Sequence, residues 1–165
     1  MSKELTTIFE TDISGKITTC ILTDGTNTFH GIASCHDDDM EFRSSLVGQE
    51  IAYNRAVIEY LRHCRDTEIK PKLQILNHLI GSMKNSKHFN PKSYETKMIF
   101  RQINLYNDIL LGLKEEIAVI QRNTQSLIQS KNETYTKFRN VRKKKAFEER
   151  LKEIEKTLEQ QKGRN

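Results

Sequence analysis

Apolar side chains recur at alternating steps of four and three residues along the second half of the chain. The series runs Ile99, Ile103, Tyr106, Leu110, Leu113, Ile117, Ile120, Thr124 and Leu127. This heptad spacing is typical of a helix that packs lengthwise on other helices. It weakens near Lys131, resumes at Phe138 and Val141, and restarts out of phase at Phe147, Leu151, Ile154 and Leu158. We therefore expect one long helix over 93–165, either continuous or folded back near 143–145.

A different pattern occupies the N-terminal part, where three short β-prone runs cover 5–11, 16–23 and 27–34. Ser14-Gly15 separates the first two runs, and Asp24-Gly25 separates the second from the third. Asp-Gly between such runs is typical of a type I′ hairpin turn, in which both central residues have positive φ. We predict a three-stranded antiparallel meander. Three strands alone are marginally stable, so one face should pack on the first helix.

The first helix should begin near Leu46, with Ser44 or Ser45 as its cap. Pro71 has no amide hydrogen, which predicts a kink or break at 67–71. Asn90-Pro91 then separates this helical segment from the long one. The predicted fold is α+β, mainly α: a β-meander head (1–43), a first helix with its linker (44–92), and a long basic coiled-coil helix (93–165). The two helical parts should form an antiparallel hairpin.

Charge is divided unevenly along the chain, whose formal net charge is +5. Residues 1–50 carry three basic and nine acidic side chains, so the remaining residues hold 24 basic and 13 acidic ones. Six cations fall within nine residues: Lys137, Arg139, Arg142, Lys143, Lys144 and Lys145. Such a helix face could contact phosphates or an acidic partner, although glutamates one or two turns later could also pair with it. A second basic group with interleaved aromatic residues surrounds the linker: Lys87, His88, Phe89, Tyr94 and Arg101.

Cys35 and His36 precede Asp37, Asp38 and Asp39. A zinc site would need further ligands, and the nearest ones are His30 and Cys20; the expected register places Cys20 opposite residue 31 instead of Cys35. A Cys35–His36 nucleophile is disfavoured, because adjacent residues of a strand point to opposite faces. A Mg²⁺ nuclease using the aspartates is a further alternative. We expect no metal, no cofactor and no catalytic residues, with the three aspartates forming an acidic surface of the head.

The three cysteines are odd in number and lack paired spacing, and we expect no secretory leader. No apolar run approaches the roughly 20 residues needed to span a bilayer. We therefore expect reduced thiols, a cytoplasmic location and no membrane contact.

Two motifs carry a resemblance to a known group of proteins. The first is Gly-x-Ala-x-Cys-His-x-x-Asp at 31–39, and the second is Gly-x-x-x-Ala-x-x-Arg-Ala at 48–56. With the segment 82–95, they resemble small accessory proteins of phages and prophages of Gram-positive bacteria. In similar proteins a proline often follows the histidine, where this chain has Asp37. The resemblance implies a non-enzymatic inhibitor of host defence or host machinery, and it transfers no catalytic residue.

These observations lead to one main functional hypothesis and three alternatives. The main one is a phage-type accessory protein that binds and inhibits a host protein or ribonucleoprotein, such as a CRISPR effector. The first alternative is an oligomeric DNA- or RNA-binding protein that uses the basic helix. The second is sequestration of a phosphorylated small-molecule signal near the linker, and the third is an enzyme using His36 and the aspartates. The apolar stripe beyond residue 130 predicts a homodimer or higher oligomer.

Overall fold

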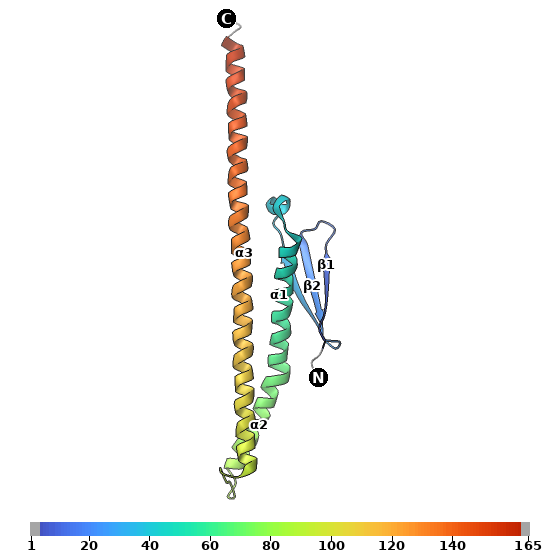
Figure 1. Ribbon diagram of the computed structural model, residues 1–165, viewed down its shortest axis with the longest axis vertical. Helices are drawn as coiled ribbons and strands as arrows, with labels where there is room; N and C mark the ends of the chain where they lie inside the picture. Colours follow the sequence, from blue (N-terminus) through green and yellow to red (C-terminus); the bar gives the residue numbers. More distant parts are fainter. Residues whose placement is uncertain (1–3, 163–165) are drawn as a thin grey trace. The chain divides into compact units, whose positions relative to one another are not determined.

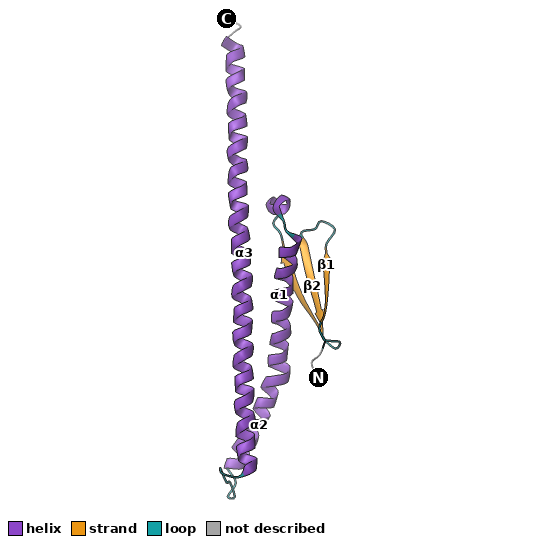
Figure 2. Ribbon diagram, viewed as in Figure 1, coloured by secondary structure: helices purple, strands orange, loops and turns teal. Residues whose placement is uncertain are grey.

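The computed structural model describes residues 4–162, without the side chains at 38, 155 and 157–162. An antiparallel sheet of order β1-β2-β3 precedes a series of helices, so the predicted α+β, mainly α fold is confirmed (Figures 1 and 2). The elements are β1 (Thr6–Thr11), β2 (Ile17–Thr23), β3 (Thr28–Ser34), the 3₁₀ helix η1 (Asp37–Phe42), α1 (Ser45–His63), the π-helix η2 (Cys64–Ile69), α2 (Lys70–Lys84) and α3 (Tyr94–Lys162).

Contacts divide the chain into two compact units, Met1–Gln125 and Ser126–Asn165. The first unit holds the sheet, α1, η2, α2 and the beginning of α3. Within the described residues, the second consists of the rest of α3. The helix continues through Lys143–Lys145, so the alternative of a fold-back at that point is wrong. Between Gly112 and Gly163 the sequence has neither glycine nor proline, which accounts for the uninterrupted helix.

The pairing of β2 with β3 has the predicted register, with Cys20 opposite Gly31. On the other side of β2, Cys20 lies opposite Phe9 of β1. Alternation along β2 buries one face of the strand against α1. The core beneath the sheet consists of Cys20, Leu22, Phe29, Ala33, Ala52 and Ala56. This small core confirms that the three strands depend on α1 for burial of their apolar face.

Gly31 allows the backbones of β3 and α1 to approach each other closely. A Cβ atom at this position would lie 1.9 Å from the carbonyl oxygen of Ala52 and 2.5 Å from the amide nitrogen of Ala56. One turn earlier, a Cβ at Gly48 would lie 3.1 Å from Oγ1 of Thr18. The small residues at 48, 52 and 56 therefore form one row along α1 that faces the sheet. The two sequence motifs at 31–39 and 48–56 thus contain the residues of this contact.

The turn between β2 and β3 differs from the predicted type I′ geometry. Four residues connect Thr23 to Thr28, and only Gly25 has positive φ (84°) among the residues described there. The carboxylate of Asp24 accepts hydrogen bonds from the amides of Thr26 (2.9 Å) and Asn27 (2.7 Å). Because the aspartate side chain satisfies these amides, a longer loop replaces the two-residue turn.

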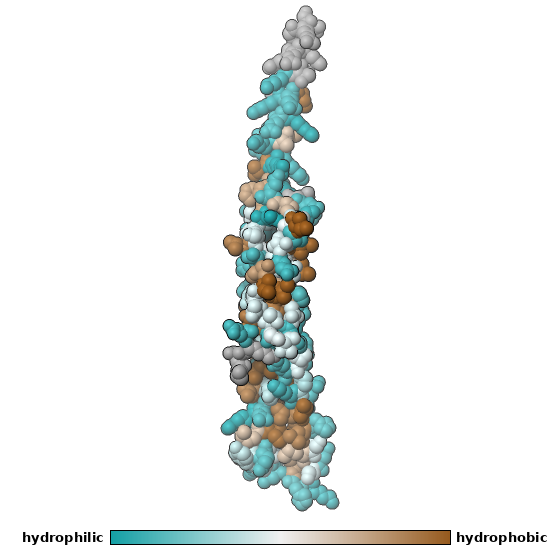
Figure 3. Space-filling view, turned by 90° about the vertical axis from the view of Figure 1, so that its right-hand side faces the viewer, coloured by the Kyte–Doolittle hydropathy of each residue, from teal (hydrophilic) through white to brown (hydrophobic). Residues whose placement is uncertain are grey.

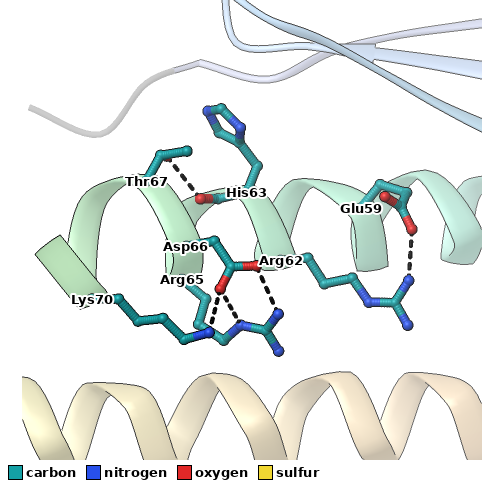
Figure 4. Close-up of polar contacts among 7 residues, drawn as sticks. All are labelled: Glu59, Arg62, His63, Arg65, Asp66, Thr67 and Lys70. Atoms are coloured by element: carbon teal, nitrogen blue, oxygen red, sulfur yellow. Dashed lines mark hydrogen bonds and ion pairs between the residues drawn. The ribbon is translucent and has the colours of Figure 1, made fainter.

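The helical segment changes character where the proline predicted a break. In η2, the Lys70 amide donates to the carbonyl of Arg65, five residues earlier, and Pro71 follows in the first turn of α2. The Asp66 carboxylate accepts from the Arg65 guanidinium at 2.9 and 2.7 Å and lies 2.7 Å from Nζ of Lys70 (Figure 4). Pro71 cannot donate the amide hydrogen bond of an α-helix, and the chain forms a π-helix immediately before this residue.

A second apolar cluster joins α1 to α3 and confirms the helical hairpin. Ile58 and Leu61 of α1 pack with Ile117 of α3, flanked by Val57, Tyr60, Leu113 and Ile120.

At the start of α3, Oγ of Ser93 accepts a hydrogen bond from the Thr96 amide at 3.2 Å. Many apolar side chains nevertheless remain exposed, as the brown areas of Figure 3 show.

We predict that Gly31→Ala destabilises the protein, because the added methyl group would meet the Ala52 carbonyl, which cannot move without shifting α1. The expected loss is about 1–3 kcal/mol in the free energy of unfolding, measured by urea denaturation. Gly112→Ala is the matched control, since its Cβ meets no atom within 4 Å. That change should stabilise α3 by about 0.5–1 kcal/mol. A Gly31→Ala variant as stable as the wild type would contradict the close contact.

We also predict that Asp66→Asn weakens the acid sensitivity of folding. Hydrogen bonds from Arg65, and then from Lys70, hold the pKa of Asp66 well below its ordinary value of 3.8. The folded state thus keeps this carboxylate ionised where the unfolded chain protonates it, so its contribution is present above the ordinary pKa and is lost as pH falls. Urea denaturation between about pH 5 and pH 2 should show a shallower loss of stability in the variant. Equal slopes would contradict this role.

Candidate functional site

The strongest candidate surface lies on the second unit, in α3. Residues 137–145 of this helix, here called the basic segment, carry the six clustered cations. Arg139 is half-buried, and the other five are exposed: Lys137, Arg142, Lys143, Lys144 and Lys145. The continuous helix therefore exposes five of the six cations to solvent, and Arg139 only in part.

Three of these cations share one face of the helix. Arg139, Arg142 and Lys145 are three residues apart, and each step of three moves about 60° around an α-helix. We call these three residues the basic arc. Phe138 and Val141, which are 46% and 67% exposed, lie on the same side. Cations beside an exposed aromatic ring are the side chains that contact phosphates and stack with bases.

Glutamates that follow the basic segment neutralise it only weakly within the helix. Glu148 and Glu149 lie four residues after Lys144 and Lys145, so each pair can approach on one face. A helix favours the opposite order, with the glutamate first, and such pairs contribute about 0.2–0.5 kcal/mol. All four side chains are exposed, and ion pairs in solvent are weak. Lys144 and Lys145 can therefore still attract an acidic partner.

The second predicted cluster lies in the turn between α2 and α3. Lys87, His88 and Arg101 are exposed, Tyr94 is 74% exposed, and Phe89 is half-buried. The turn itself is held by local bonds, including that from the His88 amide to Oγ of Ser86 at 3.3 Å. This is an open surface, whereas small-molecule sites bury most of their ligand. The geometry therefore does not favour the small-molecule alternative.

The aspartates that were predicted to form an acidic surface differ in their exposure. Asp37 is exposed and forms an ion pair with Lys16, which lowers the pKa of Asp37 and raises that of Lys16. Asp39 was expected at the surface but is only 5% exposed. It lies in the 3₁₀ turn, where its amide donates to the carbonyl of His36 at 3.0 Å. The side chain of Asp38 lies outside the described residues. The predicted acidic surface is therefore wrong at Asp39, and Asp37 is the exposed one of the two described side chains.

The cysteines lie in structural positions. Cys20 is fully buried in the core, and Cys35 is half-buried. Burial raises the pKa of the Cys35 thiol, and the nearby carboxylate of Asp39 raises it further. A raised pKa keeps a thiol protonated and poorly nucleophilic at neutral pH. Within residues 4–162, and where side chains are described, no three His, Cys, Asp or Glu side chains are grouped closely enough to hold a metal ion.

Comparisons of this chain with protein-family models, curated proteins and solved structures give no match. The resemblance to phage accessory proteins therefore remains a prediction, and the site rests on the geometry of this chain alone. In the described part of the chain, no helix has the length and apolar character required to cross a membrane.

We predict that Cys35 reacts slowly with iodoacetamide at neutral pH. Its raised pKa leaves less thiolate than a free cysteine has, and thiolate is the reacting species. Mass spectrometry of the native protein should show slower alkylation at Cys35 than of N-acetylcysteine in the same solution. The rate should increase with pH beyond the point at which that of the free thiol levels off. Alkylation faster than that of the free thiol would restore the nucleophile hypothesis.

Proposed function

We propose that this chain is a non-enzymatic binding protein of the phage accessory type that acts on a nucleic-acid-handling host system through direct contact with nucleic acid. The basic arc of α3 carries this contact. The observation that supports it most is the exposure of clustered cations on an uninterrupted helix. Phe138, an aromatic residue that is 46% exposed, lies among them.

The distribution of charge supports the same proposal. The head is acidic and the remainder strongly basic, although the whole chain has a formal net charge of only +5. A basic surface concentrated on one segment attracts polyanions more strongly than an even distribution would. Contacts made by one helix face with phosphates position a protein without reading sequence. We therefore assign weak sequence preference to this interaction.

The chemistry of the head favours binding over catalysis. His36 adjoins a cysteine whose pKa is raised, and Asp37 is engaged by Lys16. Asp39, the third acidic residue considered for catalysis, is buried in the short η1 turn. A general base or nucleophile needs the opposite properties, namely access to substrate and a pKa matched to the reaction.

We predict that Arg139→Glu, Arg142→Glu and Lys145→Glu together abolish binding to duplex DNA or RNA. Three phosphate contacts predict a slope of about −3 in the logarithm of the association constant against the logarithm of salt concentration for duplex DNA. Fluorescence anisotropy with labelled duplexes of unrelated sequence should give this slope for the wild type. The affinities for those duplexes should be similar. Circular dichroism should show unchanged helix content in the variant.

The matched control is Lys72→Glu, Lys114→Glu and Arg122→Glu, which changes net charge equally but leaves the basic arc intact. It should weaken binding far less than the change to the arc. Equal losses in both variants would show that only overall charge matters and would contradict the proposed site. Pull-downs from a bacterial host, with and without nuclease, then test the wider function. Partners that all persist after nuclease would indicate direct inhibition of a host protein and overturn the nucleic-acid contact.

A further inference from the structure

The last described part of α3 carries an apolar stripe on a different side of the helix from the basic arc. Phe147, Leu151 and Ile154 are 63%, 43% and 55% exposed. Their spacing of four and three residues places them on one side of the helix. At about 100° per residue, Phe147 lies opposite Phe138, so this stripe faces away from the basic arc. Large apolar side chains on one face of a helix indicate a surface that another helix covers.

The spacing assigns a heptad register to this stripe. Phe147 and Ile154 take the d positions, and Leu151 takes an a position. Lys144 then stands at the preceding a position, where a single polar residue can specify pairing and where its long stem can reach solvent. The sequence continues the pattern at Leu158, whose side chain lies outside the described residues.

Charges flank the stripe in a consistent order. Lys143 and Arg150 take the g positions, immediately before the a residues, and Glu148 takes the e position after Phe147. All three side chains are exposed. The sequence repeats glutamate at the next e position, 155, where the side chain lies outside the described residues. One edge of the stripe is therefore cationic and the other anionic.

We infer that this stripe binds the same stripe of a second copy of the chain, in a parallel, in-register coiled coil. In a parallel pair, each g residue lies beside the e residue five positions later in the partner. Lys143 would thus meet the glutamate at 148 of the other copy, twice by symmetry. Opposite charges then meet along both edges of the apolar seam.

The same charges oppose an antiparallel arrangement. There, g residues lie beside g residues and e residues beside e residues. The cations at 143 and 150 would meet one another, and so would the glutamates. Like charges at these positions are destabilising, so the pattern selects orientation as well as partner. The apolar seam is short, and we accordingly expect reversible association that depends on protein concentration.

Pairing in this orientation would hold two basic arcs on the outer faces of one coiled coil, pointing away from the seam. If the proposed function holds, both arcs could then contact one nucleic acid, and binding and self-association would strengthen each other. The self-association itself is independent of that function. It can therefore be tested on protein freed of nucleic acid.

The test is a charge-exchange cycle on the full chain, followed by sedimentation equilibrium after nuclease treatment. Lys143→Glu and Glu148→Lys are made singly and together. Each single change should raise the dimer dissociation constant by about tenfold, since two attractive pairs become repulsive. The double variant should return close to the wild type. Five residues separate these positions, about 140° around the helix, so the two side chains cannot pair within one chain and recovery reports a contact between copies.

The matched control places the same changes away from the seam, as Lys152→Glu and Glu149→Lys. Neither should alter the dissociation constant by more than about twofold, the scale of an exposed pair. Tighter association of Lys143→Glu would indicate antiparallel pairing, because the new glutamate would face Arg150 of the partner. That result would overturn the inference, as would a wild-type chain that stays monomeric at the highest soluble concentration. Loss of nucleic-acid binding with self-association intact would reject the proposed function alone.

Discussion

The fold of the first unit depends on how closely β3 approaches α1. A sheet of three strands buries little apolar surface, and this one has a core of only a few side chains. Such a core stabilises the fold only when backbone and small side chains are in direct contact, because dispersion forces weaken steeply with distance. Gly31 and the row at Gly48, Ala52 and Ala56 make that contact possible. Arg55 of α1 adds a hydrogen bond to the carbonyl of Ile32 on the same strand.

The close contact between β3 and α1 explains the two sequence motifs in structural terms. The motif at 31–39 contains a cysteine, a histidine and aspartates, and the motif at 48–56 contains glycine and alanines. Cysteine, histidine and aspartate are residues common in active sites. In the structure, the glycines and alanines of the two motifs form the helix–sheet contact, and Asp39 is buried in a short turn. The motifs therefore describe how the head is built. The cations of the proposed binding surface lie elsewhere, on α3.

Sequence periodicity predicted most of the fold because its signals were local and repeated. Strand register followed from alternation. The missing amide hydrogen of Pro71 predicted a kink or break at 67–71, and the structure instead has a π-helix at Cys64–Ile69, with no gap in the helical segment. The turn at Asp24 could not be predicted in detail, since its aspartate side chain competes with the backbone for the same amides. The close contact at Gly31 depends on residues about 20 positions apart, which local patterns do not relate. The only sequence signal for it is the four-residue spacing of small side chains on α1. The basic segment was identified from sequence, whereas its distribution around the helix required knowing that α3 is continuous.

The position of β1 has a consequence for the motions of the head. All six residues of this strand are exposed, whereas α1 buries alternate residues of β2 and β3. β1 is therefore held chiefly by its hydrogen-bonded ladder to β2, with little apolar burial to oppose separation. Opening of this strand leaves the core under β2 and β3 in place. Its amide hydrogens should accordingly exchange with solvent long before those of β3, and a proteolytic cut in this strand would leave the helix–sheet contact intact.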